Sequence, residues 1–283
     1  MKKFNIFLLF PIFTFNAAGY SQSTQASPVS ITSVALTATV APTNEHLTYG
    51  CPACQGTLLT RVGYVFCYDN TKKVSLGVAY HLTKDDLNGL EKRSNYKFLA
   101  DPALPPVERA ENKDYNKSGY DKGAHVSGRR SSPQCHNHER MLLPIEYVPT
   151  IASTQPAPMG KLLVGTKIRA LAAKDGEIWV YVGPIFEKDP SGMAFKLEKT
   201  IGKNQIWIPW GFYKIVVFKD RGQLQALAFQ YMNQDETNDF YAHETTIDNI
   251  QYETGLDFLN ALSKNMKLTK EKLSKQELNN PLN

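Results

Sequence analysis

The sequence of 283 residues contains only four cysteines, and after its first 19 residues it has no apolar run close to the length of a membrane helix. A helix that spans a bilayer needs roughly 20 consecutive apolar residues. The rest of the chain is therefore not expected to cross a membrane. No cysteine closely follows the N-terminal apolar run, which argues against a lipoprotein anchor, and no internal repeat is found.

The N-terminal residues 1–19 have the pattern of a secretory signal peptide. Lys2 and Lys3 precede an apolar run from Phe4 to Phe15, and small residues up to Gly19 follow it. A charged start, an apolar segment and small residues at the cleavage point define such peptides. We therefore expect cleavage after Gly19 and a mature protein that is secreted or periplasmic.

Export would place the cysteines in an oxidising compartment, where an even number of thiols favours disulfides. Two disulfides are expected, and the sequence does not choose among the three possible pairings. A Cys-x-x-Cys spacing also begins many zinc sites, but the other two cysteines do not repeat it, and a closed zinc site needs compact pairs of ligands. The disulfide candidates are Cys51, Cys54, Cys67 and Cys135.

Positive charge is in slight excess, with a formal net charge of +5 and a pI near 8.8. Such a bias is compatible with a polyanionic partner but does not identify one. The local distribution is more informative, because five basic residues crowd one short, turn-rich segment around a histidine. They are Lys113, Lys117, Lys122, Arg129 and Arg130.

Composition also divides the chain into segments. No charged residue occurs from Ser21 to Asn44, where Ser, Thr, Ala and Val predominate, which is typical of a flexible leader. We assign 20–46 to this leader, 47–263 to a single folded domain and 264–283 to a polar C-terminal tail.

Hydrophobic patterns within the domain predict a mixed α+β fold. Runs rich in Val, Tyr and Phe predict two strands that pair as a hairpin around residues 69–71, and further strands follow. A helix cap is expected at Thr83, because acidic residues follow it in the first turn. The expected strands cover 58–68, which contains a glycine break, 74–82, 178–185 and 224–232, and 205–218 is expected to be a strand pair interrupted by Pro209 and Gly211. Further helices are expected over 161–174 and from Thr246.

Six short motifs, in a fixed order, carry a resemblance to a known family. They are Leu82–Leu87 (LTKDDL) with Arg93 after it, Phe98–Pro102 (FLADP), Tyr120–His125 (YDKGAH), Trp179–Pro184 (WVYVGP), Ile208–Ile215 (IPWGFYKI) and Thr254–Phe258 (TGLDF). In this order they resemble the motifs of the DNA/RNA non-specific endonucleases, whose signature is Asp-Arg-Gly-His. The resemblance implies a single ββα-metal domain with a central antiparallel sheet.

The resemblance also implies catalytic roles for four residues. Cleavage of a phosphodiester needs an activated water and stabilisation of the growing negative charge. His125 would be the general base, because a neutral imidazole can accept a proton from water near neutral pH. Asp121 would orient the turn or the imidazole. Arg93 and Lys122 would stabilise charge, although Lys122 lacks the planar fork of the arginine that the family has there.

The family binds a metal ion, Mg2+ or Mn2+, mainly through an asparagine, and this sequence departs from that pattern. The positions that correspond to the asparagine hold Gln155 or Ala157, depending on the direction of counting. Gln155 offers a carbonyl oxygen, which is a suitable ligand for Mg2+. A second departure is Ala124, an extra residue before His125, which requires a bulge or a wider turn if the ring is to reach the site.

Taken together, these features predict a secreted, metal-dependent endonuclease that hydrolyses DNA and RNA with little sequence specificity. Arg129, Arg130 and Lys117 would contact backbone phosphates of the nucleic acid. The alternative is a catalytically inactive relative that binds nucleic acid or a protein. A secreted adhesive or toxin-like protein is a weaker third hypothesis that rests only on the leader. The string from His136 to Glu139 is expected to be a surface loop and not an HNH motif, whose residues are spread over a longer unit.

Overall fold

A computed structural model describes residues 44–52, 54, 56–88, 99–124, 147–151, 168–186, 188, 199–233 and 243–262. Every described residue belongs to the unit Pro42–Asn283. The expected signal peptide, most of the leader and the C-terminal tail lie outside the described residues. None of the helices within the described ranges has the length and apolar character needed to cross a membrane.

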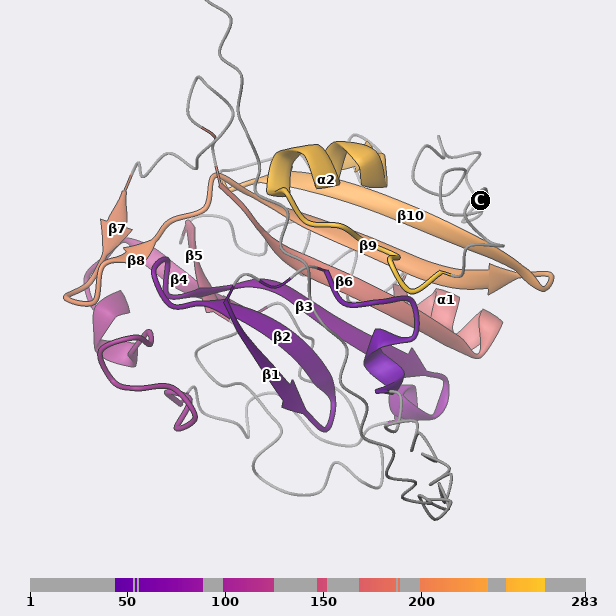
Figure 1. Ribbon diagram of the computed structural model, residues 1–283, viewed down its shortest axis with the longest axis horizontal. Coiled ribbons are helices and arrows are strands. Elements are labelled where there is room, and N and C mark those ends of the chain that lie inside the picture. Colours follow the sequence, from indigo (N-terminus) through magenta and orange to yellow (C-terminus); the bar gives the residue numbers. More distant parts are fainter. Residues whose placement is uncertain are drawn as a thin grey trace, which may run out of the picture. The chain divides into compact units, whose positions relative to one another are not determined.

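The fold is organised around a seven-stranded antiparallel sheet in the order β1-β2-β3-β6-β9-β10-β11 (Figure 1). This confirms the expected α+β class with a central antiparallel sheet. Two small ribbons, β4–β5 and β7–β8, are separate from this sheet. The strands are β1 (Thr57–Arg61), β2 (Tyr64–Asp69), β3 (Val74–Thr83), β4 (Tyr120–Ala124), β5 (Tyr147–Ile151), β6 (Glu177–Ile185), β7 (Thr200–Ile201), β8 (Ile206–Trp207), β9 (Gly211–Asp220), β10 (Gln223–Met232) and β11 (Glu244–Thr245).

The middle strands β6 and β9 are buried on both faces. Ile178 and Val180 of β6 join one apolar cluster, while Trp179 and Tyr181 join another on the opposite face. A strand covered on both sides needs apolar residues at every position, because successive side chains point to opposite faces. This explains the continuous apolar run that predicted the strand over 178–185.

One helix covers each face of the sheet. Helix α1 (Ile168–Asp175) buries Ile168, Leu171 and Ala172 in the cluster that contains Val180. Helix α2 (Ile247–Thr254) buries Ile247 and Ile250 in the cluster that contains Tyr181, and it contacts β10 (Figure 1). The expected helix over 161–174 is confirmed from Ile168, and residues 161–167 lie outside the described part.

The ends of α2 follow its sequence signals. The Thr246 side chain accepts a hydrogen bond from the Asn249 backbone N–H at 3.1 Å, which is an N-cap. Gly255 has φ +71 and its N–H donates to the Gln251 carbonyl at 2.8 Å, which is a left-handed C-cap. The helix expected from Thr246 is therefore confirmed, and its limits are set by local chemistry.

The helix expected after Thr83 is described only as its first turn. The Thr83 hydroxyl accepts from the Asp86 N–H at 3.3 Å, and an Asp86 carboxylate oxygen accepts from the Thr83 N–H at 2.8 Å. This reciprocal cap leads into a 3-10 turn, η2 (Asp85–Asn88). Residues 89–98, which include Arg93, lie outside the described part of the chain.

The single strand expected over 58–68 is wrong. A turn at Val62 and Gly63 divides this segment into β1 and β2, which pair directly across it with Arg61 opposite Tyr64. Five of the six β2 residues are buried, whereas β1 is an edge strand with only partly buried or exposed side chains. The expected hairpin around residues 69–71 is confirmed as the connection between β2 and β3.

Gly183 has a packing role in the motif Trp179–Pro184. A Cβ at this position would lie 2.3 Å from the Leu76 carbonyl oxygen and 2.7 Å from the Tyr213 hydroxyl. That hydroxyl is itself fixed, because it donates to the same Leu76 carbonyl at 3.1 Å. Only glycine therefore allows β3, β6 and β9 to approach one another here.

The first described residues dock on the sheet. In the 3-10 turn η1 (Glu45–Leu47), the buried His46 ring accepts through Nδ1 from the His81 backbone N–H at 3.1 Å. Its Nε2 lies 2.9 Å from the Val62 carbonyl and donates to it in the tautomer that this geometry requires. The Trp179 indole N–H donates to the Glu45 carbonyl at 3.0 Å. Packed structure therefore begins slightly before Leu47.

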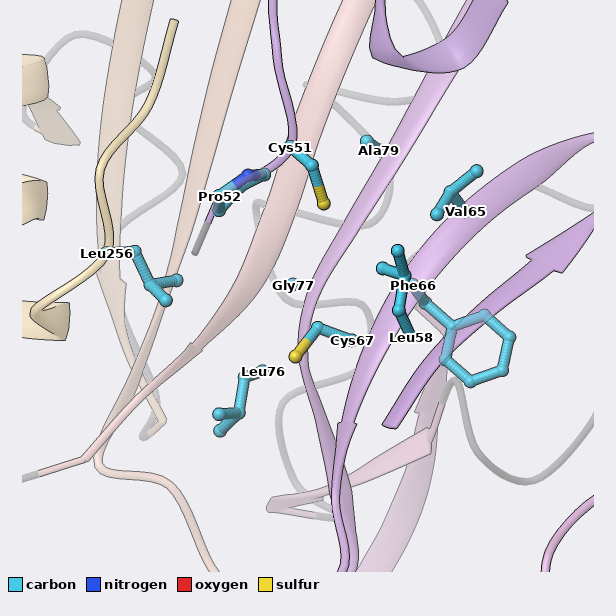
Figure 2. A pocket seen from close by; sticks show the side chains of 10 residues that line it. All are labelled: Cys51, Pro52, Leu58, Val65, Phe66, Cys67, Leu76, Gly77, Ala79 and Leu256. Carbon is cyan, nitrogen blue, oxygen red and sulfur yellow. The ribbon is translucent and has the colours of Figure 1, made fainter. Parts of the chain in front are cut away.

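The cysteines form one disulfide within the described residues. Cys54 and Cys67 are bonded, with their Cα atoms 5.5 Å apart, and the Cys51 thiol is free. Cys51 and Cys67 line the same apolar pocket, with both sulfur atoms turned toward its interior (Figure 2). Burial raises the pKa of the Cys51 thiol. One of the two expected disulfides is thus present. The remaining candidate partner of Cys51 is Cys135, which lies outside the described residues, so the second disulfide stays a prediction.

Loss of the Cys54–Cys67 bond should destabilise the domain measurably. The bond closes a short loop, with a sequence separation of 13, and a loop of this length corresponds to about 3 kcal/mol of stabilisation. Replacement of both residues by Ser should lower the free energy of unfolding by about that amount in urea titrations. Cys51→Ser is the matched control and should change it little. Peptide mapping without reductant should recover Cys54 linked to Cys67, and recovery of Cys51 linked to either would contradict the assignment.

A lysine lies in the interior of the sheet. Lys214 of β9 has 1% of its surface exposed and is paired in register with Val182 and Phe229. No hydrogen bond or ion pair joins its side-chain amine to another described residue. Burial among apolar groups disfavours the charged amine and lowers its pKa to about 7. Lys214 therefore opposes folding at any pH at which the unfolded chain carries it charged.

Lys214→Met should stabilise the protein in a pH-dependent manner. The folded-state pKa lies below the unfolded value, so the unfolded state binds more protons between about pH 7 and pH 10 and stability rises with pH across that window. The gain from the substitution should be largest near and below pH 7, on the order of 4 kcal/mol, and should shrink toward pH 10. Urea unfolding across this range measures it, with the exposed Lys84→Met as control. A gain independent of pH would contradict the burial of a titrating amine.

Candidate functional site

The ribbon of β4 and β5 carries the segment that was expected to be the active site. Asp121 of β4 is exposed and Lys122 is partly buried. The strands pair antiparallel, with Lys122 opposite Pro149 and Ala124 opposite Tyr147. The next residue is His125, which lies outside the described residues.

The pairing register of this ribbon shows whether β4 contains a bulge that would accommodate the additional residue Ala124. Pairing runs without a shift from Tyr120 to Ala124, so β4 contains no bulge in its described length. Side chains alternate along a strand, and Asp121 and Lys122 therefore project to opposite faces of the ribbon. The bulge or wider turn that Ala124 requires is not provided within β4.

Lys122 fixes β4 to the preceding 3-10 turn η4 (Asn112–Tyr115). Its ammonium donates to the Asn112 side-chain carbonyl at 2.8 Å and lies 5.8 Å from the centre of the Tyr115 ring. Burial raises the pKa of Tyr115, so this ring stays uncharged and contributes only its π-face. Lys122 thus has a positioning contact in addition to its positive charge.

Asp114, also in η4, connects this turn to a distant part of the chain. Its side chain has 1% exposure and accepts from the Glu111 N–H at 2.9 Å, which closes the turn. Its two oxygens also accept from Asn204, from the backbone N–H at 3.1 Å and from the side-chain amide at 2.9 Å. Asn204 lies between β7 and β8, so one buried carboxylate holds that hairpin against η4.

Asn233 anchors the other strand of the ribbon to the main sheet. Its buried side-chain amide donates to the carbonyls of Pro149 and Pro209, both at 2.9 Å. Its backbone N–H donates to the Trp210 carbonyl. Because Pro149 belongs to β5 and Asn233 directly follows β10, this side chain sets the position of the ribbon relative to the sheet.

The motif Phe98–Pro102 has a structural explanation. Asp101 is fully buried, forms an ion pair with Arg61 of β1 and accepts from the Ala103 N–H at 2.7 Å. Arg109 donates to the backbone carbonyls of Asp101 and Leu104 at 2.9 and 3.2 Å. These contacts hold the loop before η4 in one conformation, because each buried polar group has a partner.

The expected site residues divide into two groups. Asp121, Lys122 and Lys117 are described, and Lys117 is an exposed residue with φ +57 next to η4. The remaining candidates lie outside the described residues: Arg93, His125, Arg129, Arg130, Gln155 and Cys135. Sequence analysis missed three side chains that position the ribbon and its neighbours, Asp114, Asn204 and Asn233. No local pattern marks them, since each acts through a partner far away in the sequence.

The described residues do not by themselves form a metal site. Within the described ranges, His, Cys, Asp and Glu side chains nowhere gather in a group of three that would hold an ion. The expected ligand Gln155 is not among these residues. The described part of the site is therefore the β4–β5 ribbon, which carries Lys122 and the exposed Asp121, with the exposed Lys117 just before it.

Comparison with known proteins places this arrangement in a family. The sequence model for DNA/RNA non-specific endonucleases matches residues 42–142 and 162–265. The mitochondrial nuclease EXOG of Danio rerio is 29% identical over 71% of this chain, and the match spans 60% of that protein, less than two thirds of its length. The mitochondrial endonuclease G of Homo sapiens is 26% identical over 76% of this chain and 73% of its own. Nuclease C1 of Cunninghamella echinulata var. echinulata is 24% identical over 78% of this chain and 90% of its own.

The fold is also shared with a solved structure. A chain from the crystal structure of the EndoG/EndoGI complex, which addresses the mechanism of EndoG inhibition, superposes with a TM-score of 0.68 at 24% sequence identity. The superposition covers 81% of this chain and 95% of that one, which supports a single ββα-metal nuclease domain. With the family's sequence model matching most of its length, this chain belongs to the DNA/RNA non-specific endonuclease family.

Proposed function

We propose that the protein is an endonuclease that hydrolyses phosphodiester bonds of DNA and RNA with little sequence preference. The observation that carries the proposal is the family match, which includes the signature segment from Asp121 to His125. The contacts around β4 support it, since Lys122 is held by an exposed hydrogen bond to Asn112 and the partner strand β5 is held by a buried one from Asn233. Sequence-independent binding agrees with a chain that offers basic side chains to phosphates.

In the proposed reaction His125 accepts a proton from the attacking water as the water oxygen bonds to phosphorus. The P–O bond to the leaving sugar oxygen breaks, and that oxygen takes a proton from solvent. A neutral imidazole suits this step near neutral pH. Arg93 and Lys122 stabilise the negative charge that grows on the phosphate oxygens. Asp121 orients the imidazole or the turn that carries it. The hydrogen bond to Asn112 holds the Lys122 ammonium in place relative to η4.

A divalent cation, Mg2+ or Mn2+, is part of the proposal because of family membership. Such an ion supplies charge neutralisation at the phosphate and at the leaving oxygen. Gln155 is the proposed ligand, through its side-chain oxygen. The described residues lack a cluster that fits the ion, so no step above is assigned to it, and the dependence is tested by EDTA and by titration of each metal.

Export is also a proposal, based on residues 1–19. It agrees with the Cys54–Cys67 disulfide, since disulfides persist in oxidising compartments. The domain limits, with a leader over 20–46, a nuclease domain over 47–263 and a tail over 264–283, belong to the same proposal. Mass spectrometry of the exported protein would locate its mature N-terminus, expected at Tyr20.

A second candidate function is a catalytically inactive family member that binds nucleic acid or a protein. The specific observation in its favour is that neither Gln155 nor Ala157 is the asparagine expected as the family's metal ligand. Incubation of the mature protein with plasmid and RNA in Mg2+ separates the two. Retarded but intact nucleic acid, released as the salt concentration rises, would support this second function.

His125→Ala should abolish most cleavage. A positioned general base contributes roughly 100- to 10,000-fold to rate, and kcat/KM on plasmid DNA and RNA should fall within that range in Mg2+. His138→Ala is the matched control and should retain wild-type activity. Full activity of His125→Ala, with the control also active, would remove His125 from the mechanism.

Substitutions at Lys122 and Asn112 should distinguish the contribution of the Lys122 charge from that of its hydrogen bond to Asn112. Lys122→Met removes both and should lower kcat/KM roughly 100-fold or more, as loss of one charge-stabilising donor does. Asn112→Ala removes only the hydrogen bond and should cost less. Lys122→Arg should retain most activity, because guanidinium supplies the fork that the family uses. Equal losses for Lys122→Met and Asn112→Ala would assign Lys122 to positioning alone.

A further inference from the structure

The contact between η4 and the β7–β8 hairpin brings together two segments that are about 90 residues apart, with Asp114 and Asn204 at its centre. Asn204 also donates to the Arg109 carbonyl at 3.2 Å. Gly202, with φ +69, lies so close that a Cβ there would be 2.2 Å from the Asp114 Cβ. The hairpin is therefore fixed against η4 by direct contact, and we refer to this junction as the clasp.

Lysines flank the clasp on both sides. Lys113 precedes Asp114, Lys203 precedes Asn204, and both side chains are exposed. Lys117 and Lys199 are exposed nearby in sequence, one after η4 and one before β7. The buried Asp114 carboxylate accepts its described hydrogen bonds from N–H groups of Glu111 and Asn204 and forms no ion pair with these lysines.

The charge of these four lysines is available to a ligand. Elsewhere in the domain, Lys72, Lys174 and Lys219 each lie within 4 Å of a carboxylate, at 2.6, 3.9 and 3.1 Å. In the described part of the chain, no carboxylate forms an ion pair with any lysine of the clasp group, which consists of Lys113, Lys117, Lys199 and Lys203. The described segment 199–210 also contains no Asp or Glu.

We propose that the clasp group binds backbone phosphates of a polynucleotide beyond the bond that is cleaved. This inference rests on the proposed function and deepens it, since it adds lysines from a hairpin that follows the signature by some 80 residues. Uncompensated lysines held on a fixed surface neutralise phosphates and release counterions, which gives affinity without sequence preference. The site therefore favours long polyanionic chains over short ones.

The experiment compares Lys113→Gln/Lys203→Gln with Lys84→Gln/Lys174→Gln, a control pair that removes the same charge from exposed side chains at the α1 end of the sheet. Full-length mature protein is titrated with a fluorescent 30-mer duplex in EDTA, so that binding is measured without cleavage. The Lys113→Gln/Lys203→Gln variant, called the clasp variant, should bind the duplex at least about fivefold more weakly at low salt. The slope of log association constant against log salt concentration should decrease in magnitude by about two. The control pair should change the slope by less than half of that.

A second variant and a cleavage assay complete the test. Asn204→Ala keeps every lysine but loosens the hairpin, and it should lose part of the same affinity while thermal unfolding confirms that it is folded. In Mg2+, the clasp variant should raise KM on plasmid but leave cleavage of bis(p-nitrophenyl) phosphate unchanged. Equal slopes for the clasp and control pairs, or no duplex binding by the wild type, would overturn the inference. If the clasp variant shows the reduced salt slope while the wild type binds the duplex but cleaves no nucleic acid, the inference about the clasp group is upheld and the proposed nuclease function is overturned.

Discussion

The structure depends on the burial of the central strand pair β6–β9 on both faces. Side chains such as Val180 and Val216 require an apolar cover on one side, and Tyr181 and Ile215 require it on the other. Both α1 and α2 meet that requirement by packing on opposite faces. Apolar burial stabilises such a core by roughly 25 cal/mol per Å², which allows the sheet to tolerate a buried amine at Lys214.

The functional region is held by a different kind of interaction. The β4–β5 ribbon is a separate two-stranded sheet, and such a ribbon is marginal alone in water. It is attached by directional polar contacts, from Asn233 to the β5 backbone and from Lys122 to Asn112 of η4, while Asp114 joins η4 in turn to Asn204 of the β7–β8 hairpin. Hydrogen bonds fix orientation in a way that apolar contacts do not, because they weaken steeply when misaligned. The core thus supplies stability, and a few amide and carboxylate groups supply geometry.

Much of the fold followed from local patterns. Apolar-rich segments predicted β6, β9 and β10, and the apolar spacing that begins at Ile247 predicted α2. The glycine break within 58–68 was visible in the sequence, but a hairpin was predicted only around residues 69–71, so the turn at Gly63 that separates β1 from β2 was not predicted. The order of the motifs identified the family, although Gly183 and Asp101 in those motifs proved to serve packing and loop geometry. The roles proposed for Arg93, His125 and Gln155 rest on the sequence, since these residues lie outside the described part of the chain.

The sequence by itself determined the class of fold, the family and the type of chemistry to expect, because strand alternation, helix caps and ordered motifs are local signals. Only the tertiary structure decided that Cys54 bonds with Cys67 while Cys51 stays free, and that Lys203 lies beside η4. These contacts join residues that are distant in the sequence but close in the folded structure. A buried Asp114 and a distant Asn204 satisfy each other only once the backbone brings them together, and no spacing along the chain encodes that meeting.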